Sequence, residues 1–147
     1  MNYVRDILKE KGSGVYWVNP QTSILDALKM MAEKNVGALL VLEKAKITGI
    51  ISERDFAHQI ARLGACPMQQ AVGEFMITEV IVVPPDASIN ECMQLMTREH
   101  IRHLPVVDQG MLAGIISIGD VVKAVISGHK STIKSLENYI LGQDHSQ

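Results

Sequence analysis

The chain contains one stretch of sequence twice, and this internal repeat constrains its fold more than any other feature. GIISERD at 49–55 returns as GIISIGD at 114–120, and the match extends without gaps to 18–56 against 83–121. Twelve of these 39 paired positions are identical, and most of the others are conservative. VRDIL ahead of the first copy is similar to VGEFM ahead of the second, which predicts a small helix before each copy. The chain is therefore a tandem duplication.

Both copies show the same alternation of strand and helix patterns. Each begins with a short extended run that ends at Pro20 or Pro85, because the residue before a proline avoids the helical region. An amphipathic helix follows, and Ser-x-x-Asp/Glu at 23–26 and 88–91 is typical of a capping box at its start. Two short apolar runs and a second helix complete a β-α-β-β-α repeat. We therefore expect an α/β fold in which two pseudo-twofold-related repeats pack as one module.

The repeat boundaries predict five segments along the chain. These are an N-terminal helix and linker (1–14), the first repeat (15–63), a linker with a short helix (64–79), the second repeat (80–128), and a C-terminal helix and tail (129–147). Both terminal helices carry apolar stripes, formed by Val4, Ile7 and Leu8 and by Ile133, Leu136 and Ile140. Such stripes suit either the chain's own core or the contact of a homodimer.

The composition of the chain argues against several functional classes. Apolar residues make up 47% and charged residues 20% of the 147-residue chain, as in ordinary globular proteins. No apolar run approaches the roughly 18–20 residues that cross a bilayer, and the N-terminus lacks the features of a secretion signal or transit peptide. A net charge of −2 with few aromatic residues gives no case for nucleic-acid binding. Cys66 and Cys92 form neither a CxxC motif nor a disulfide framework, so we expect a cytoplasmic protein without membrane partners.

The repeated pattern resembles the cystathionine β-synthase (CBS) domain, and the duplication resembles a CBS pair, also called a Bateman module. The resemblance rests on V-x-P-x-x-S-I, the helix after it, a strand such as RHLPVVD, and G-I-I-S-x-x-D, which follow one another in both copies. It covers nearly the whole chain and leaves no room for a catalytic domain, as in stand-alone CBS-pair proteins of bacterial type. The second repeat is closer to the family pattern, since it has Arg-His-Leu-Pro at 102–105 where the first has Gly-Ala-Leu-Leu at 37–40.

The resemblance implies a non-enzymatic regulatory protein that senses an adenosyl ligand. Members of the family bind AMP, ADP, ATP, S-adenosylmethionine or related nucleotides such as NAD in clefts between their repeats, and they commonly form flat homodimers. We expect AMP first. By this resemblance Asp55 and Asp120 each face one cleft and contact ribose hydroxyls, with Ser52 and Ser117 beside them. Repeat symmetry completes the two clefts with four residues of the opening strands: Val80 and Ile81 for Asp55, Val15 and Tyr16 for Asp120.

The residue types explain why such a site uses them. A strand-to-helix turn presents free backbone N–H groups and the positive end of a helix to phosphate or sugar oxygens. A carboxylate accepts hydrogen bonds from both ribose hydroxyls. Gly49 and Gly114 let a ligand approach the strand closely, and Ile50 and Ile115 can wall an adenine ring.

The two clefts should differ in charge. Arg102 and His103 precede the buried strand at Pro105, and the matching positions in CBS pairs point toward the ligand's phosphate. Arg102 has a planar fork that matches phosphate oxygens, and His103 adds a second donor. Arg54 is a further cation, whose counterpart is the uncharged Gly119. All of these residues belong to the expected nucleotide site.

Other interpretations stay open from the residues alone. Ser-x-x-Asp is also a helix-start pattern, so both Ser–Asp pairs can serve as caps in a ligand-free scaffold module. Arg102 can instead pair with Glu99 or Asp108 at a solvated edge. A metal- or redox-responsive protein would use His100, His103 and the cysteines, although no further ligands follow at plausible spacing. We expect no metal site and no catalytic residue, because no nucleophile elbow or acid–base pair is present.

Overall fold

The computed structural model describes residues 1–140, and the chain divides into two units. The first-repeat unit is Gly14–Ile81, and the second-repeat unit combines Met1–Ser13 with the chain from Val82 onward. Each unit therefore holds one of the predicted repeats together with the short segment that precedes the other copy. Residues 141–147 of the predicted tail lie outside the described residues.

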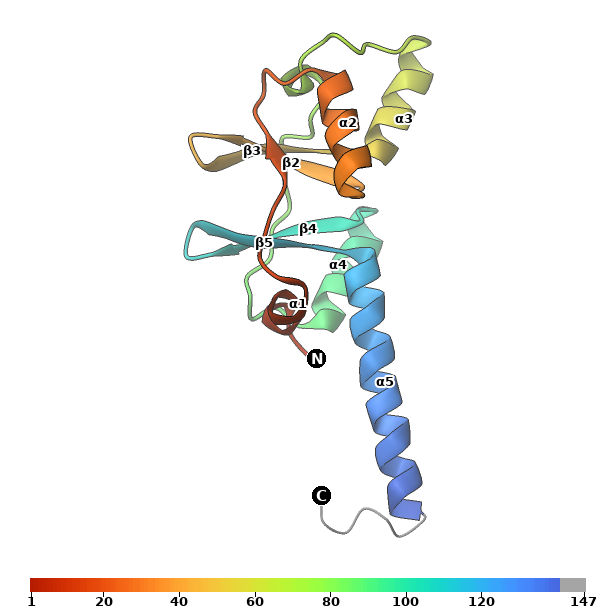
Figure 1. The fold of residues 1–147 in the computed structure, drawn as a ribbon. Coiled ribbons are helices and arrows are strands. Elements are labelled where there is room, and N and C mark those ends of the chain that lie inside the picture. Colours follow the sequence, from red (N-terminus) through yellow and green to blue (C-terminus); the bar gives the residue numbers. More distant parts are fainter. Residues whose placement is uncertain (141–147) are drawn as a thin grey trace. The chain divides into compact units, whose positions relative to one another are not determined.

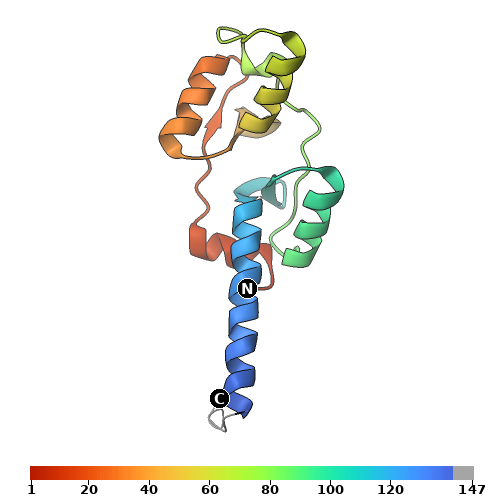
Figure 2. The same ribbon diagram turned by 90° about the vertical axis from the view of Figure 1, so that its right-hand side faces the viewer.

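The first-repeat unit has the predicted β-α-β-β-α order and ends with a one-turn helix. Strand β2 pairs in parallel with β1 and antiparallel with β3, and α2 and α3 lie side by side against the sheet (Figures 1 and 2). Its elements are β1 (Trp17–Val18), α2 (Ile24–Lys34), β2 (Ala38–Glu43), β3 (Lys46–Ser52), α3 (Glu53–Leu63) and the 3-10 helix η1 (Val72–Glu74).

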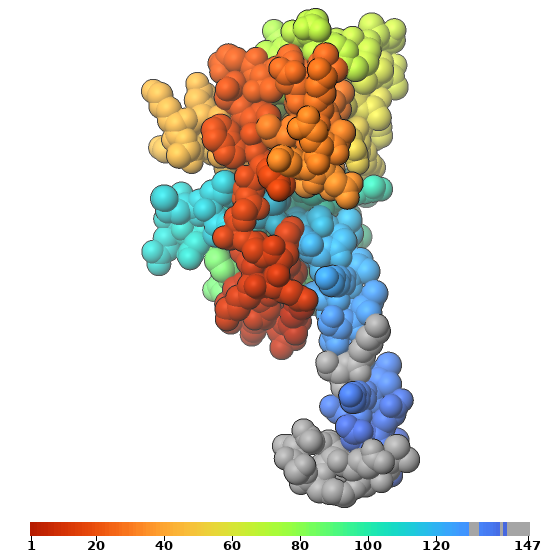
Figure 3. Space-filling view, viewed as in Figure 1, coloured from red at the N-terminus to blue at the C-terminus, as the bar shows by residue number. Residues whose placement is uncertain are grey.

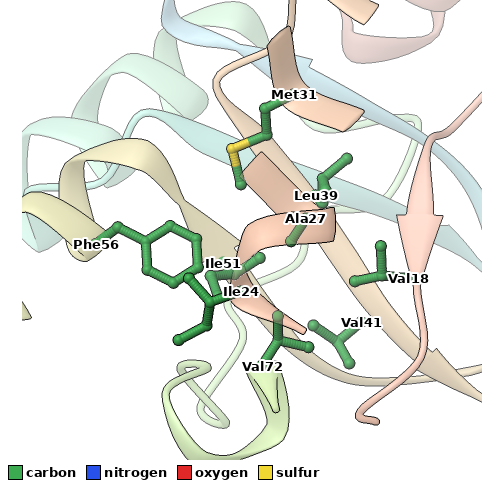
Figure 4. Close-up of a cluster of buried hydrophobic side chains, with 9 residues drawn as sticks. All are labelled: Val18, Ile24, Ala27, Met31, Leu39, Val41, Ile51, Phe56 and Val72. Atoms are coloured by element: carbon green, nitrogen blue, oxygen red, sulfur yellow. The ribbon is translucent and has the colours of Figure 1, made fainter. Parts of the chain in front are cut away.

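Side chains from all six elements form one apolar core in this unit (Figure 4). The apolar residues of α2 recur three and four positions apart, which places them on one helix face. Leu39 and Val41 lie two residues apart on β2 and therefore point to the same face of the sheet. Phe56 enters this core from α3. The buried cluster comprises Val18, Ile24, Ala27, Met31, Leu39, Val41, Ile51, Phe56 and Val72.

The second-repeat unit follows the same plan with one strand fewer. Its elements are α1 (Val4–Lys11), α4 (Ile89–Glu99), β4 (His103–Asp108), β5 (Met111–Ser117) and α5 (Ile118–Ile140). The opening strand predicted for this repeat is reduced to a single parallel bridge, between Val83 and Val106. Pro105 of β4 stands where the first repeat has Leu40, the partner of Trp17, and a proline has no N–H to extend the ladder by that pair.

Helix α5 also differs from the prediction, because the last helix of the repeat and the predicted C-terminal helix are one continuous helix. Gly64 at the end of α3 adopts a left-handed φ of 66° and terminates that helix, whereas Gly128 stays helical and α5 continues past it. No described helix has both the length and the apolar character that crossing a membrane requires.

The segment ahead of each copy packs on the other copy. Leu8 of α1 fills the space above Gly114 of β5, and Met76, just after η1, fills the space above Gly49 of β3. Figure 2 shows α1 beside α5, within the second-repeat unit. The predicted small helix before each copy is confirmed, as α1 in one case and η1 in the other.

The apolar stripe of α1 serves the chain's own core. Val4 and Ile7 are buried, and the Val4 N–H donates to the Ala87 carbonyl oxygen at 2.9 Å. Of the two uses predicted for this stripe, the internal one is therefore observed.

Gly49→Ala should destabilise the protein, because a Cβ there would lie 2.5 Å from Met76 Sδ and 3.0 Å from the Ile77 carbonyl oxygen. The methionine can move, but that oxygen is held by the Ile50–Ile77 bridge. We expect a loss of about 1–3 kcal/mol in the free energy of unfolding, measured by urea denaturation. The control is Gly128→Ala, where a helical position meets open space and the gain should be about 0.5–1 kcal/mol. Similar effects of both changes would contradict the tight packing above Gly49.

Candidate functional site

In the first-repeat unit, the turn from Ser52 to Asp55 joins the end of β3 to the start of α3. Ser52 is the N-cap residue, and its Oγ accepts a hydrogen bond from the Asp55 N–H at 3.1 Å. The same hydroxyl donates to Asp55 Oδ2 at 2.8 Å, which fixes the orientation of the carboxylate. The Glu53 N–H donates to the Gly37 carbonyl oxygen at 3.1 Å and ties the turn to the start of β2.

The matching turn in the second-repeat unit joins β5 to α5. Ser117 Oγ accepts from the Asp120 N–H at 3.2 Å, and Asp120 Oδ2 accepts from the Ser117 N–H at 2.8 Å. This reciprocal pair is a capping box. The prediction that both Ser–Asp pairs can cap their helices is therefore confirmed, and each cap holds a half-buried carboxylate at a strand-to-helix turn.

A lysine distinguishes the two turns. Lys11 Nζ of α1 lies 2.7 Å from Asp120 Oδ2 and 3.0 Å from the Ile115 carbonyl oxygen. Burial acts to raise the pKa of Asp120, but the hydrogen bonds from Lys11 and the Ser117 N–H, with the lysine charge, lower this pKa overall. The carboxylate is thus held ionised and paired.

Lys11 is a site residue that the sequence motifs do not point to. A signal was present, because extending the similarity of 4–8 and 72–76 by three residues places Lys11 opposite Glu79. Nothing in that comparison indicates, however, which carboxylate the lysine meets.

The two basic residues of the second repeat lie beside its turn. His103 is the strand partner of Ser117, and the Arg102 carbonyl oxygen accepts from the Ile118 N–H at 2.8 Å. The Arg102 side chain is exposed. Glu99, one alternative partner for it, instead accepts a hydrogen bond from Arg98 Nε at 3.2 Å.

The other predicted residues divide between the two units. Val15, Tyr16, Val80 and Ile81 all belong to the first-repeat unit, and so does Asp55. Asp120 belongs to the second-repeat unit, so completion of its site by Val15 and Tyr16 stays a prediction. Tyr16 is exposed, and Lys34 Nζ lies 5.4 Å from the centroid of its ring.

The glycines and isoleucines before each turn have roles in packing and strand pairing. The space above Gly49 and Gly114 holds Met76 and Leu8, so the close approach seen at these glycines is that of a side chain. Ile50 exchanges two backbone hydrogen bonds of 3.0 Å with residue 77. Pro105 is fully buried in β4, and Arg54 is exposed on the first turn of α3.

His100 and Cys92 have structural roles, one at the end of α4 and the other in its buried face. Among residues 1–140, no three His, Cys, Asp or Glu side chains are placed to hold a metal ion. His100 ends α4 with a left-handed φ of 55°, as Asn35 ends α2 with 54°. Cys92 is buried in α4, and burial with the Glu91 charge raises the pKa of its thiol to about 11, whereas Cys66 is exposed. The Cys92 thiol therefore stays protonated at neutral pH.

An open hollow of about 440 Å³ lies elsewhere in the second-repeat unit, between residues 83–87 and α4. Its lining includes Asp86, Glu91 and Arg98, and it contains none of the predicted ligand-binding residues. We therefore place the candidate site at the two capped turns.

Comparison with known proteins identifies the class. The CBS domain matches residues 4–62 and 72–127, so the chain belongs to the CBS-domain family and carries two copies. It is 39% identical over 149 residues to the CBS domain-containing protein CBSX3, mitochondrial, of Arabidopsis thaliana, covering 95% of this chain and 72% of that protein.

Solved structures show the same fold. A protein with CBS domains from Burkholderia ambifaria is 45% identical, with a TM-score of 0.82, covering 85% of this chain and 94% of that one. The CBS pair of MJ0100, solved in complex with 5′-methylthioadenosine and S-adenosylmethionine, is 25% identical with a TM-score of 0.73, covering 86% and 97%. The chain is thus a CBS-pair regulatory protein, and one relative binds adenosyl ligands.

Proposed function

We propose that the protein senses an adenine nucleotide, with AMP as the first candidate, at the Ser-x-x-Asp turns of its repeats. The observation that supports this best is the pair of half-buried carboxylates, each fixed by its own serine at the start of a helix. Such a carboxylate can accept both hydroxyls of a ribose, while the helix start favours phosphate oxygens. ADP, ATP, NAD and S-adenosylmethionine share the adenosine part and are the next candidates.

The adenosyl complex of MJ0100 supports the ligand class. Charge supports a phosphate, because Arg102 and His103 lie beside the turn of the second repeat, and Arg54 stands on the first turn of α3. Arg102 would meet a phosphate with two parallel donors. In this proposal, nucleotide binding regulates a partner of the protein, without catalysis.

A ligand-free scaffold is the second candidate, favoured because both Ser-x-x-Asp pairs serve their helices as caps. A thermal-shift series with AMP, ATP, NAD and S-adenosylmethionine separates the two functions. A nucleotide at about 100 times its dissociation constant should add about 2.7 kcal/mol to the free energy of unfolding. A scaffold would show no shift with any of them.

We propose that the chain forms a homodimer through α5. This helix extends past α1 and α4, and its last part reaches well beyond α1 (Figures 1 and 3). It carries a row of exposed residues spaced alternately four and three apart, which is the coiled-coil period. Ile133, Leu136 and Ile140 of this row are 55%, 57% and 78% exposed. The full row comprises Val122, Ile126, His129, Ile133, Leu136 and Ile140.

The second copy should run antiparallel. The spacing of the row reads the same in both directions, so a two-fold axis can place Val122 opposite Ile140 of the other copy. The same arrangement brings the exposed Lys123 close to the exposed Glu137 at the edge of the row. Opposite charges thus favour this orientation.

Replacing both Ile133 and Leu136 with Glu should convert a dimer to a monomer, because four carboxylates would enter one apolar seam. Sedimentation equilibrium at micromolar concentration measures the result. Ser135→Glu, between them and outside the row, is the control and should leave the dimer intact. A wild-type monomer, or a double variant that is still dimeric, would contradict this interface.

The cytoplasmic location expected above stays a prediction, because CBSX3 is named as a mitochondrial protein.

A further inference from the structure

Helix α1 holds Lys11 firmly against the second-repeat turn. Leu8 packs on Gly114, and Val4 and Ile7 are buried beneath the helix. Lys11 is the last residue of α1, where the helix dipole also favours a positive charge. Its side chain is 35% exposed and that of its partner Asp120 is 22% exposed, so solvent screens this ion pair less than a pair on the open surface.

We propose that Lys11 is a specificity-determining residue: it keeps a ribose from Asp120, so that the nucleotide binds at the Asp55 turn alone. The inference rests on the proposed function and adds which of the two turns is used. The cation for the phosphate is then Arg54 on α3, and Arg102 and His103 serve a nucleotide only when Lys11 is replaced. Asp120 Oδ2 already accepts from the Ser117 N–H at 2.8 Å and from Lys11 Nζ at 2.7 Å. A ribose that binds both carboxylate oxygens through its two hydroxyls would have to displace the ammonium from Oδ2, and the charged hydrogen bond is the stronger of the two.

Lys11 also occupies a backbone acceptor next to Asp120. The Ile115 carbonyl oxygen accepts from Lys11 Nζ at 3.0 Å, which occupies a second polar position beside the turn. Its counterpart, the Ile50 carbonyl oxygen, accepts instead from the Ile77 N–H at 3.0 Å within a backbone bridge. Glu79 stands at the position that matches Lys11, and its carboxylate cannot donate a hydrogen bond. The first-repeat turn therefore has no equivalent of this lysine.

Isothermal titration calorimetry with AMP tests the inference by stoichiometry. We expect one AMP per chain for the wild type and two for Lys11→Met, which keeps the aliphatic stem and removes the ammonium. Lys9→Met on the same helix is the matched control and should stay at one. Lys11→Gln, which keeps polarity but no charge, should also bind two and replaces the methionine variant if that variant loosens α1.

Adding Asp55→Ala shows which of the two turns binds the AMP. In the wild-type background it should weaken the single site by about 10- to 150-fold, and in the Lys11→Met background one AMP per chain should still bind at full affinity, at Asp120. Two AMP per chain in the wild type, or one in both Lys11 variants, would overturn the role of Lys11 and leave the proposed function intact. No AMP binding by any variant would overturn both this inference and AMP as the sensed nucleotide.

Discussion

Asp55→Ala should weaken AMP binding by about 10- to 150-fold, because a charge-assisted hydrogen bond contributes about 1.5–3 kcal/mol. The carboxylate is half-buried and oriented by Ser52, so little of its freedom is left to lose when a ribose binds. Calorimetric titration of both proteins with AMP measures the ratio of their dissociation constants.

The same unit supplies a matched control for that variant. Ser23 caps α2 by accepting from the Asp26 N–H at 3.1 Å, so Asp26 holds the same place in a Ser-x-x-Asp turn. Asp26→Ala should leave the AMP affinity unchanged. Unchanged affinity in the Asp55 variant as well would show that its carboxylate serves only the helix cap.

Leu39→Ala should cost about 2–5 kcal/mol of unfolding free energy, the range for emptying a fully buried leucine site. Leu39 is 0% exposed on β2, between β1 and β3, and it belongs to the core beneath α2 and α3 (Figure 4). Leu63→Ala, at a leucine that is 56% exposed at the end of α3, should stay within about 0.5 kcal/mol.

Chemical denaturation of the two leucine variants measures this difference. Equal midpoints and equal slopes for both would contradict the assignment of Leu39 to the core.

The repeat carries most of the information about the fold. Periods of 2 and 3.6 are local properties, so the strands ALLVLE and ITGII and the helices around them follow from the sequence. The local apolar pattern at 80–83 predicts a strand but not its reduction to one bridge, because the residue that shortens the ladder is Pro105, in the strand beside it. The length of α5 was not predicted because a glycine can end a helix, as Gly64 does, or continue it, as Gly128 does, and the local pattern does not separate the two cases.

The helix caps of the candidate site could be predicted from the sequence, but the ion-pair partner of Asp120 could not. Ser-x-x-Asp acts within four residues, so the sequence alone indicates that Ser52 and Ser117 can cap their helices, and the structure has both caps. The ion pair of Lys11 with Asp120 joins positions that are distant in the chain, and it exists because α1 packs on the second copy instead of the first. Such contacts depend on tertiary packing, which periodicity does not record.

Equilibrium dialysis of the wild-type protein against labelled AMP tests the central claim most directly, with CMP as the control ligand. CMP keeps the ribose and the phosphate and changes only the base. The proposed function predicts saturable retention of AMP and little retention of CMP. Absence of AMP retention at millimolar concentration, or equal retention of both nucleotides, would contradict an adenine-nucleotide sensor.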